Sequence, residues 1–476
     1  MLTLGDIIQA TIGTDTGGMP GGDWPIRDVA IDSRQAGPDC LFVGLKGETV
    51  DGSDFADDAI AKGAAAVIVS RAPARAAQVC TPGTAPAAIT PPIAIVVPDT
   101  LWALQELAAY WRRRVNVRVV GVTGSVGKTV TKELTASILS RRYVTLRNEG
   151  NLNNEIGLPL TLLKVTPKTE YAVLEMGMYA LGEIARLAEI ARPSVGVVTN
   201  VEPVHLERLG SMERIAQAKA ELVQALPADG VAILNGDDPR VRAMATLTKA
   251  RLFTYGLSPD CDLYATDVES QGLEGIRFRL HYRGDAIHAR AALLGTHSAH
   301  TALAATAVAL NEGLAWQEIM AGLMDVSAQL RLIATPAIRG ALLLDDTYNA
   351  SPKSTIAALN LLAELKGRRI AVLGDMLELG ALEDEGHRKV ARRAIEVVSR
   401  LIAVGRRGRI IGEEALACGM SPEDVVIVEN NAQAIGILSD WIQEGDIILV
   451  KGSRGMHMED IVQALRAGEG ADWQVR

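Results

Sequence analysis

The segment GVTGSVGKT, residues 121–129, combines small residues with a lysine and a threonine in a pattern typical of loops that bind nucleotide phosphates. An apolar β-type run, Val117–Val122, precedes it, and a helix-type run, Thr129–Arg142, follows it. In a strand–turn–helix context, backbone N–H groups of the turn and the N-terminus of the helix converge on phosphate oxygens. We therefore predict that Lys128 neutralises charge on the β- and γ-phosphates and that the Thr129 hydroxyl binds Mg²⁺.

The motif departs from the standard spacing at one position, because Val122 stands five residues before Gly127, where glycine is usual. An ordinary Gly-rich turn between a strand and a helix is therefore an alternative that the segment alone leaves open. The residues predicted to contact ATP in this loop are Thr123, Gly124, Ser125, Val126, Gly127, Lys128 and Thr129.

Polar side chains also end three later strand-like runs. Glu175 closes YAVLE, Asn200 closes VGVVTN, and Asp237 follows VAILNG. Ligands of open parallel sheets bind at the carboxyl ends of the strands, so these side chains lie where chemistry is expected. An acid after a phosphate loop can hold Mg²⁺, although Glu175 alone also fits a solvated strand end.

Two further residues have weaker signals when each is taken alone. His205, in TNVEPVHLERLG, is a lone histidine, which is more often structural than a ligand. Lys219, in AQAKAEL, has the helical period of a solvated lysine. The amide-rich run 148–157 suits a loop that hydrogen-bonds a polar ligand, and the run 345–354 suits a nucleotide-contacting loop or a plain turn.

Length and composition limit the class of protein. The 476 residues suggest about three domains, and 48% hydrophobic residues are enough for real cores. A net charge of −9 argues against a general nucleic-acid or membrane-surface binder. The N-terminus lacks the basic region of a signal peptide, and no apolar run reaches the roughly 18 residues of a membrane span. Cys40, Cys80, Cys261 and Cys418 form no CxxC pair, and we expect them to be reduced and buried in a cytosolic protein.

The hydrophobic pattern predicts three α/β units. Residues 1–114 contain short strands and helices, and the Pro- and Ala-rich run 71–92 is expected to be a surface loop. Residues 115–330 show a βαβ pattern, with antiparallel strands over 263–294 before an Ala-rich helix. Residues 331–476 form another α/β unit, which we expect to be a parallel sheet wrapped by helices.

Taken together, the ordered motifs carry more information than each motif alone. The chain resembles the Mur ligase family over nearly its whole length, including a segment similar to that family's UDP-sugar-binding domain at residues 32–55. The motifs that carry the resemblance are GVTGSVGKT, NLNNEIGLPLTLL, VLEMG, TNVEPVHLERLGS, AQAKAEL, LNGDD, DDTYNASPKS, VLGDMLELG and LVKGSRG.

The resemblance implies a three-domain ligase with a UDP-sugar-binding domain, a P-loop ATPase-like central sheet and a Rossmann-like C-terminal domain that closes over the substrates. The implied partners are a UDP-N-acetylmuramoyl-tripeptide and D-alanyl-D-alanine. ATP would phosphorylate the terminal carboxylate of the tripeptide, and the amine of the dipeptide would attack the acyl phosphate. The protein is expected to act as a cytoplasmic monomer, with neither nucleic acid nor membrane insertion.

The resemblance also assigns roles to individual residues. Lys128, His205 and Lys219 would be catalytic. Thr129 and Glu175 would hold a first Mg²⁺, whereas His205 and a carbamylated Lys219 would hold a second. The positions that match substrate-binding residues of the family are Ser33, Arg34, Asn153 and Asn154. The positions that match residues reaching ATP from the C-terminal domain are Arg331 and Asp346.

One segment departs from the family pattern, in which GxHNxxN precedes the Ala-rich helix and places amides near adenine. Here the segment reads GTHSAHT, with Ser298 and Thr301 in place of the two asparagines. Adenine contacts from this segment are therefore in doubt. A sibling ligase of different substrate, a P-loop kinase or switch, and a non-catalytic scaffold remain as alternatives.

Overall fold

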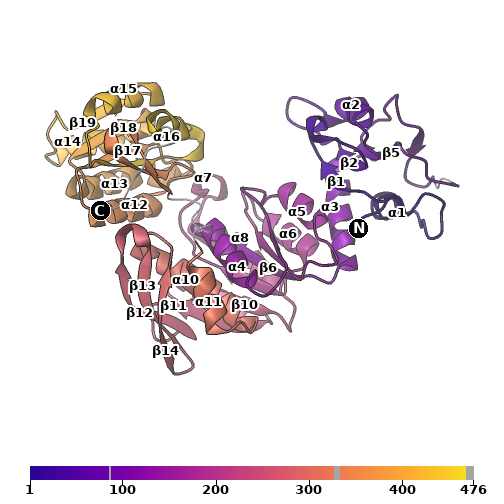
Figure 1. Ribbon diagram of the computed structural model, residues 1–476, viewed down its shortest axis with the longest axis horizontal. Coiled ribbons are helices and arrows are strands. Elements are labelled where there is room, and N and C mark those ends of the chain that lie inside the picture. The colour runs from indigo at the N-terminus through magenta and orange to yellow at the C-terminus, as the bar shows by residue number, and fades with distance from the viewer. Residues whose placement is uncertain (85–86, 326–332, 468–476) are drawn as a thin grey trace.

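The computed structural model describes residues 1–84, 87–325 and 333–467. Three β-sheets, each covered by helices, follow one another along the chain, and Figure 1 shows them as three lobes with the central lobe in the middle. The strands of all three sheets are mostly parallel. The predicted α/β class is confirmed.

The first sheet has five parallel strands in the order β1-β2-β3-β5-β4. Its elements are α1 (Leu4–Ile12), β1 (Asp28–Ala30), β2 (Cys40–Val43), α2 (Ala56–Ala61), β3 (Ala66–Val69), β4 (Gln78–Cys80), β5 (Ile93–Val96) and α3 (Thr100–Arg114).

The prediction of a surface loop over residues 71–92 was wrong in part. Strand β4 lies inside this segment and pairs with β5 at the edge of the sheet. Cys80 and Ile89 are both buried, so two side chains of this segment belong to the core of the first lobe. The composition of the segment showed no sign of this burial. A three-residue strand is too short to give a visible period of two.

The second sheet has nine strands in the order β14-β13-β12-β11-β10-β9-β6-β8-β7. Its strands are β6 (Arg118–Thr123), β7 (Thr145–Arg147), β8 (Tyr171–Glu175), β9 (Val195–Val198), β10 (Val231–Asn235), β11 (Arg251–Gly256), β12 (Leu263–Ser270), β13 (Ile276–Tyr282) and β14 (Asp285–Ala291). Its helices are α4 (Lys128–Leu139), α5 (Gly157–Leu163), α6 (Glu183–Ala191), α7 (Leu206–Leu209), α8 (Met212–Gln224), α9 (Pro239–Ala243), α10 (Ala299–Asn311) and α11 (Trp316–Leu323). The predicted antiparallel strands are confirmed as β12, β13 and β14.

Helices cover both faces of this sheet because its strands are apolar on both sides. In β6, Val119 belongs to the core shared with α3, α5, α6 and α8, whereas Val120 and Val122 belong to the core shared with α4, α10 and α11. This alternation follows from the period of two in a strand. Side chains of β6 are therefore packed on both faces of the sheet, and β6 leads directly into the phosphate-loop motif.

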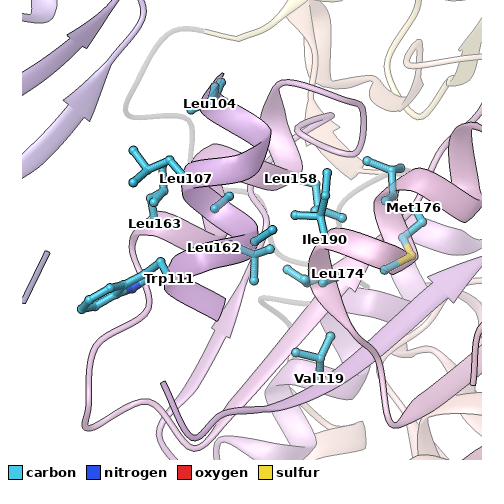
Figure 2. Close-up of a cluster of buried hydrophobic side chains, with 14 of the residues drawn as sticks. Leu104, Leu107, Trp111, Val119, Leu158, Leu162, Leu163, Leu174, Met176 and Ile190 are labelled. Atoms are coloured by element: carbon cyan, nitrogen blue, oxygen red, sulfur yellow. The ribbon is translucent and has the colours of Figure 1, made fainter. Parts of the chain in front are cut away.

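Helix α3 connects the first lobe to the central lobe. Figure 2 shows its Leu104, Leu107 and Trp111 in one cluster with leucines of α5 and with Ile190 of α6. The indole N–H of Trp111 also donates to the carbonyl of Val165, at 2.9 Å. The helix therefore packs on the central sheet, although it closes the first lobe in sequence.

The third sheet has the order β15-β16-β20-β17-β18-β19, in which β15 and β16 pair antiparallel and the other described pairs are parallel. Its elements are β15 (Ile333–Pro336), β16 (Leu342–Asp346), α12 (Pro352–Glu364), β17 (Arg369–Gly374), α13 (Glu383–Val397), β18 (Arg400–Val404), α14 (Gly405–Ala417), β19 (Val425–Val428), α15 (Asn431–Trp441), β20 (Ile447–Lys451) and α16 (Glu459–Leu465). Helices α12, α13 and α14 share one core with the sheet, and α15 and α16 share the other.

The structure corrects one further expectation. Cys40, Cys80 and Cys261 are buried as predicted, but Cys418 is exposed at the end of α14. All four thiols are free. Across the described ranges, each helix is too short or too polar to cross a lipid bilayer.

Candidate active site

The phosphate-loop motif lies where the strand order of the central sheet changes direction. Strand β6 lies between β8 and β9. The next strands in the chain, β7 and β8, lie on one side of β6, and the strands from β9 onward lie on the other side. Gly127 is the N-cap residue of α4 and has φ 86°. Because glycine has no side chain, the first-turn N–H groups of α4 receive no capping oxygen from it. This geometry suits an anionic ligand at the helix N-terminus.

A glycine is required at position 124. Its φ is 143°, and a Cβ there would lie 1.9 Å from Oγ1 of Thr199. The loop therefore packs tightly against the end of β9. Asn200 adds to this contact, because its Oδ1 accepts from the N–H of Val126 at 2.9 Å and its carbonyl accepts from the N–H of Ser125 at 2.9 Å.

Lys128 and Thr129 occupy the first turn of α4, as the motif predicts. The ammonium of Lys128 donates to the carbonyl of Ser125 at 3.2 Å, so the lysine folds back over the loop. Thr129 is buried. The loop is therefore compact, with its positive charge held at the helix N-terminus.

Glu175 ends β8 and is 1% exposed, which excludes the solvated strand end that the sequence left open. Its Oε1 accepts from Nδ2 of Asn153 at 2.8 Å, while its Oε2 is buried with no hydrogen-bond partner among the described residues. An unpaired buried carboxylate oxygen is costly. Such an oxygen fits a hard cation, which prefers oxygen ligands.

Lys219 lies on α8 and is 2% exposed, so the interpretation of its helical period as a solvated lysine was wrong. No hydrogen bond or ion pair of its ammonium is found within the described part of the chain. Burial, together with the nearby charge of Lys128, lowers the pKa of Lys219 well below its usual value. The lysine is therefore held in an environment that favours the neutral amine.

His205 lies immediately before α7, and its Nδ1 is paired with Oε2 of Glu378 from the third lobe. Among the described residues, no group of three or more His, Cys, Asp or Glu side chains could hold a metal ion.

A cavity of about 800 Å³ opens beside the phosphate loop and brings together the central and C-terminal lobes. From the central lobe it is lined by residues 125–127 of the loop, by residues at the ends of β9 and β10, and by six residues between positions 293 and 301. From the C-terminal lobe it is lined by Asp346 and by residues between positions 348 and 358. Lys451, also in the lining, is 2% exposed and donates to Oδ2 of Asp346 at 2.6 Å. Strands from two sheets therefore end at one site.

The GTHSAHT segment lines this cavity. The hydroxyl of Ser298 donates to the carbonyl of Leu294 at 2.7 Å, and Nε2 of His300 lies 2.7 Å from Oδ2 of Asp237. Burial, with the nearby charge of Lys451, lowers the pKa of His297 to about 4. The imidazole of His297 is therefore neutral at physiological pH.

The predicted substrate-binding residues lie elsewhere. Ser33 is buried in the first lobe, and Arg34 is exposed and paired with Asp32, whose pKa it lowers to about 2. Asn153 contacts Glu175 as described above, whereas Oδ1 of Asn154 accepts from the N–H of Gly157 at the start of α5, at 2.9 Å. Arg331 lies outside the described residues.

Several residues of the site had no clear signal in the sequence. Lys451 and Glu378 stand inside motifs that the sequence offers, LVKGSRG and VLGDMLELG, but nothing local distinguishes them as members of a site. Asn200 and Asp237 were found from their positions at strand ends. His300 was visible only as part of an altered motif.

Three family models match the chain: the catalytic domain of the Mur ligase family over residues 25–112, the Mur ligase middle domain over 122–309, and the Mur ligase glutamate ligase domain over 330–454. The chain belongs to the Mur ligase family. The UDP-N-acetylmuramoyl-tripeptide–D-alanyl-D-alanine ligase of Escherichia coli is 38% identical to it, covering 94% of this chain and 96% of the relative. The Bacillus subtilis enzyme of the same name is also 38% identical, covering 92% and 93%.

Solved structures of Mur ligases share the same fold. MurF from Acinetobacter baumannii superposes with a TM-score of 0.82 at 31% identity, covering 97% of this chain and 98% of that one. The MurF ligase of Thermotoga maritima in complex with ADP has a TM-score of 0.77 at 25% identity, covering 92% and 96%. The similarity therefore includes all three lobes.

Proposed function

We propose that the chain is an ATP-dependent ligase that joins D-alanyl-D-alanine to a UDP-N-acetylmuramoyl-tripeptide in peptidoglycan synthesis. The observation that carries this proposal is the near full-length similarity to relatives with that name, at 38% identity. The phosphate loop supports the ATP-dependent part of the proposal. So do the buried Glu175 and Lys219, and the buried Lys451 in the lining of the adjoining cavity.

The chemistry proceeds in two steps. A terminal oxygen of the tripeptide carboxylate attacks the γ-phosphorus of ATP, which releases ADP and forms an acyl phosphate. The amine of the dipeptide then attacks the acyl carbon, and the tetrahedral intermediate expels phosphate and loses a proton. Each step brings negatively charged or electron-rich groups together, so positive charge from Lys128 lowers the barrier.

Mg²⁺ would supply charge neutralisation and Lewis-acid polarisation of the phosphoryl oxygens. Thr129 and Glu175 would hold a first ion, and the unpaired Oε2 of Glu175 fits this role. His205 and a carbamylated Lys219 would hold a second ion. The burial of Lys219, which lowers its pKa, supports that modification, because only the neutral amine reacts with CO₂.

We assign residues 1–114 to a UDP-sugar-binding domain that uses Ser33 and Arg34, residues 115–330 to the ATP-binding domain, and residues 331–476 to the closing domain. Three separate sheets and three family-model matches support this division. By their match to positions of the Mur ligase family, Asp346 and Arg331 would contact ATP from the closing domain. Asn154, with Asn153, would contact the peptide substrate.

The cellular setting is part of the same proposal. Four free cysteines support a reducing compartment, and we place the protein in the cytoplasm. We keep the prediction that it acts as a monomer, which light scattering on the purified protein tests directly.

Phosphate release should require both the UDP-tripeptide and D-alanyl-D-alanine. An acyl phosphate exposed to water would be hydrolysed, so a ligase gains from withholding phosphoryl transfer until the substrates are enclosed. Phosphate would be measured with ATP and Mg²⁺ alone, with each substrate added singly, and with both. A rate with ATP alone that equals the complete reaction would support a P-loop ATPase or switch instead.

Ser298→Asn should raise the preference for ATP over GTP by about tenfold, the size of one additional hydrogen bond to the base. Ser298 lines the cavity, but its hydroxyl is used by the carbonyl of Leu294, whereas an amide is long enough to reach a ligand. The ratio of the two dissociation constants would be measured by calorimetry. Ser270→Asn, on β12 outside the cavity, is the control. If the ratio of dissociation constants for ATP and GTP is the same in both variants, the segment 295–301 does not recognise the base.

A further inference from the structure

His205 and Glu378 meet between the central and C-terminal lobes. His205 directly precedes α7, and Glu378 lies in the loop between β17 and the 3₁₀ turn η8 (Gly380–Leu382). The Nδ1 atom of His205 is paired with Oε2 of Glu378 although 173 positions separate the two residues in sequence. The contact therefore exists only when the two lobes lie against each other.

Both residues adopt a backbone conformation that is rare for side chains other than glycine. The φ angle is 59° at His205 and 64° at Glu378. Residues in this left-handed region gather at functional sites, where the surrounding structure holds them in place. Two such residues that face each other from different lobes point to a role beyond simple packing.

Neighbouring groups hold the pair from both sides. The ring of Tyr179 lies edge-on to the imidazole, with 5.2 Å between ring centroids, and Arg208 lies over Tyr179 at 4.8 Å. On the other side, the carbonyl of Glu378 accepts a long hydrogen bond from the N–H of Glu207, at 3.5 Å. The imidazole is therefore restrained by the central lobe and oriented by the C-terminal lobe.

The choice of nitrogen atom matters for metal binding. With Nδ1 engaged by a carboxylate, Nε2 is the nitrogen that remains to ligate a metal. A carboxylate that bonds the second nitrogen of a histidine ligand fixes the ring orientation and raises the basicity of the ligand. Glu378 has the position of such a carboxylate.

We propose that Glu378 is a positioning residue that orients His205 toward the second Mg²⁺ and completes that metal site only when the C-terminal lobe is docked. The inference rests on the proposed function, because it takes His205 as a metal ligand. It adds a physical link between lobe closure and catalysis. In an open molecule the imidazole would lose its carboxylate partner, and the second ion would bind weakly.

A simpler role would be that of an ion pair which only holds the lobes together. Lys353 and Glu202 form such a pair across the same boundary without contact to His205. The two roles differ in what they predict for metal affinity. A purely structural pair would change the distance between the lobes, but it would leave binding of the second ion to a closed molecule unchanged.

The experiment measures Mn²⁺ binding by electron paramagnetic resonance, using the full chain saturated with a non-hydrolysable ATP analogue and UDP-tripeptide. Glu378→Ala is expected to weaken the second Mn²⁺ by about 10- to 100-fold, the usual effect of losing such a partner, while the first ion binds as in the wild type. Glu378→Gln should lose less, because its amide oxygen still accepts from Nδ1–H. Glu385→Ala, which removes an exposed carboxylate from α13 in the same lobe, should bind both ions normally.

His205→Ala separates failure of this inference from failure of the proposed metal site. If His205→Ala loses the second ion but Glu378→Ala keeps it at wild-type affinity, Glu378 has no positioning role, and the proposed function stands. If His205→Ala also keeps both ions, His205 is not a ligand and the inference falls with that assignment. Interlobe distances from fluorescence resonance energy transfer, recorded on the same variants, check that the C-terminal lobe of the Glu378→Ala protein still docks on the central lobe.

Discussion

Lys128→Ala is expected to lower kcat on the order of 10³-fold while the protein remains folded. The ammonium of Lys128 lies over the phosphate loop at the N-terminus of α4, where charge develops on the transferred phosphoryl group. Lys219 cannot supply this charge in the proposed mechanism, because it is neutral or modified there. Initial rates of ADP formation with saturating substrates provide the measurement.

Lys168→Ala removes an exposed lysine outside the site and serves as the matched control. Circular dichroism and the thermal midpoint should be close to wild type for both variants. Near-wild-type turnover in a folded Lys128→Ala protein would contradict the assignment of the phosphate loop.

Lys219→Ala is expected to lose activity by roughly 10²- to 10³-fold and to regain part of it with added acetate or formate. A free ammonium has no lone pair and the wrong charge for a metal ligand, whereas a carbamate offers oxygens. The buried site favours the neutral amine that CO₂ requires. A small carboxylate can occupy the space that the long modified side chain leaves.

Two observations would check this second prediction. Intact-mass spectrometry after chemical trapping of the carbamate should locate it at Lys219, and Lys249→Ala, on the exposed surface, should neither lose activity nor respond to acetate. Full activity after thorough removal of CO₂ and bicarbonate would contradict the carbamate, although the ligase assignment would survive.

The local part of the site was predictable from sequence because its signals are local. A β-type run, a Gly-rich turn and a helical run stand next to one another in the chain, and the structure has β6, the loop and α4 in that order. Glu175, Asn200 and Asp237 were found for a similar reason. In a parallel sheet, the end of each strand is also an edge of the ligand crevice.

Burial and long-range pairing were not predictable in this way. The sequence around Lys219 has the period of an exposed helical position, and only packing of α8 beneath the central sheet buries that lysine. Glu378 and Lys451 reach the site from the third sheet. Strand β11 was missed, and so were β7 and β15, which have only three and four residues, so that pairing with a neighbour decides their conformation.

The most direct test of the central claim is a mass measurement of the product. The purified protein would be incubated with ATP, Mg²⁺, D-alanyl-D-alanine and, in separate reactions, UDP-tripeptides that carry diaminopimelate or lysine as the third residue. We expect a UDP-pentapeptide in at least one reaction, formed together with one ADP and one phosphate per amide bond. Absence of pentapeptide from both reactions, with a folded protein that binds ATP, would contradict the proposed function.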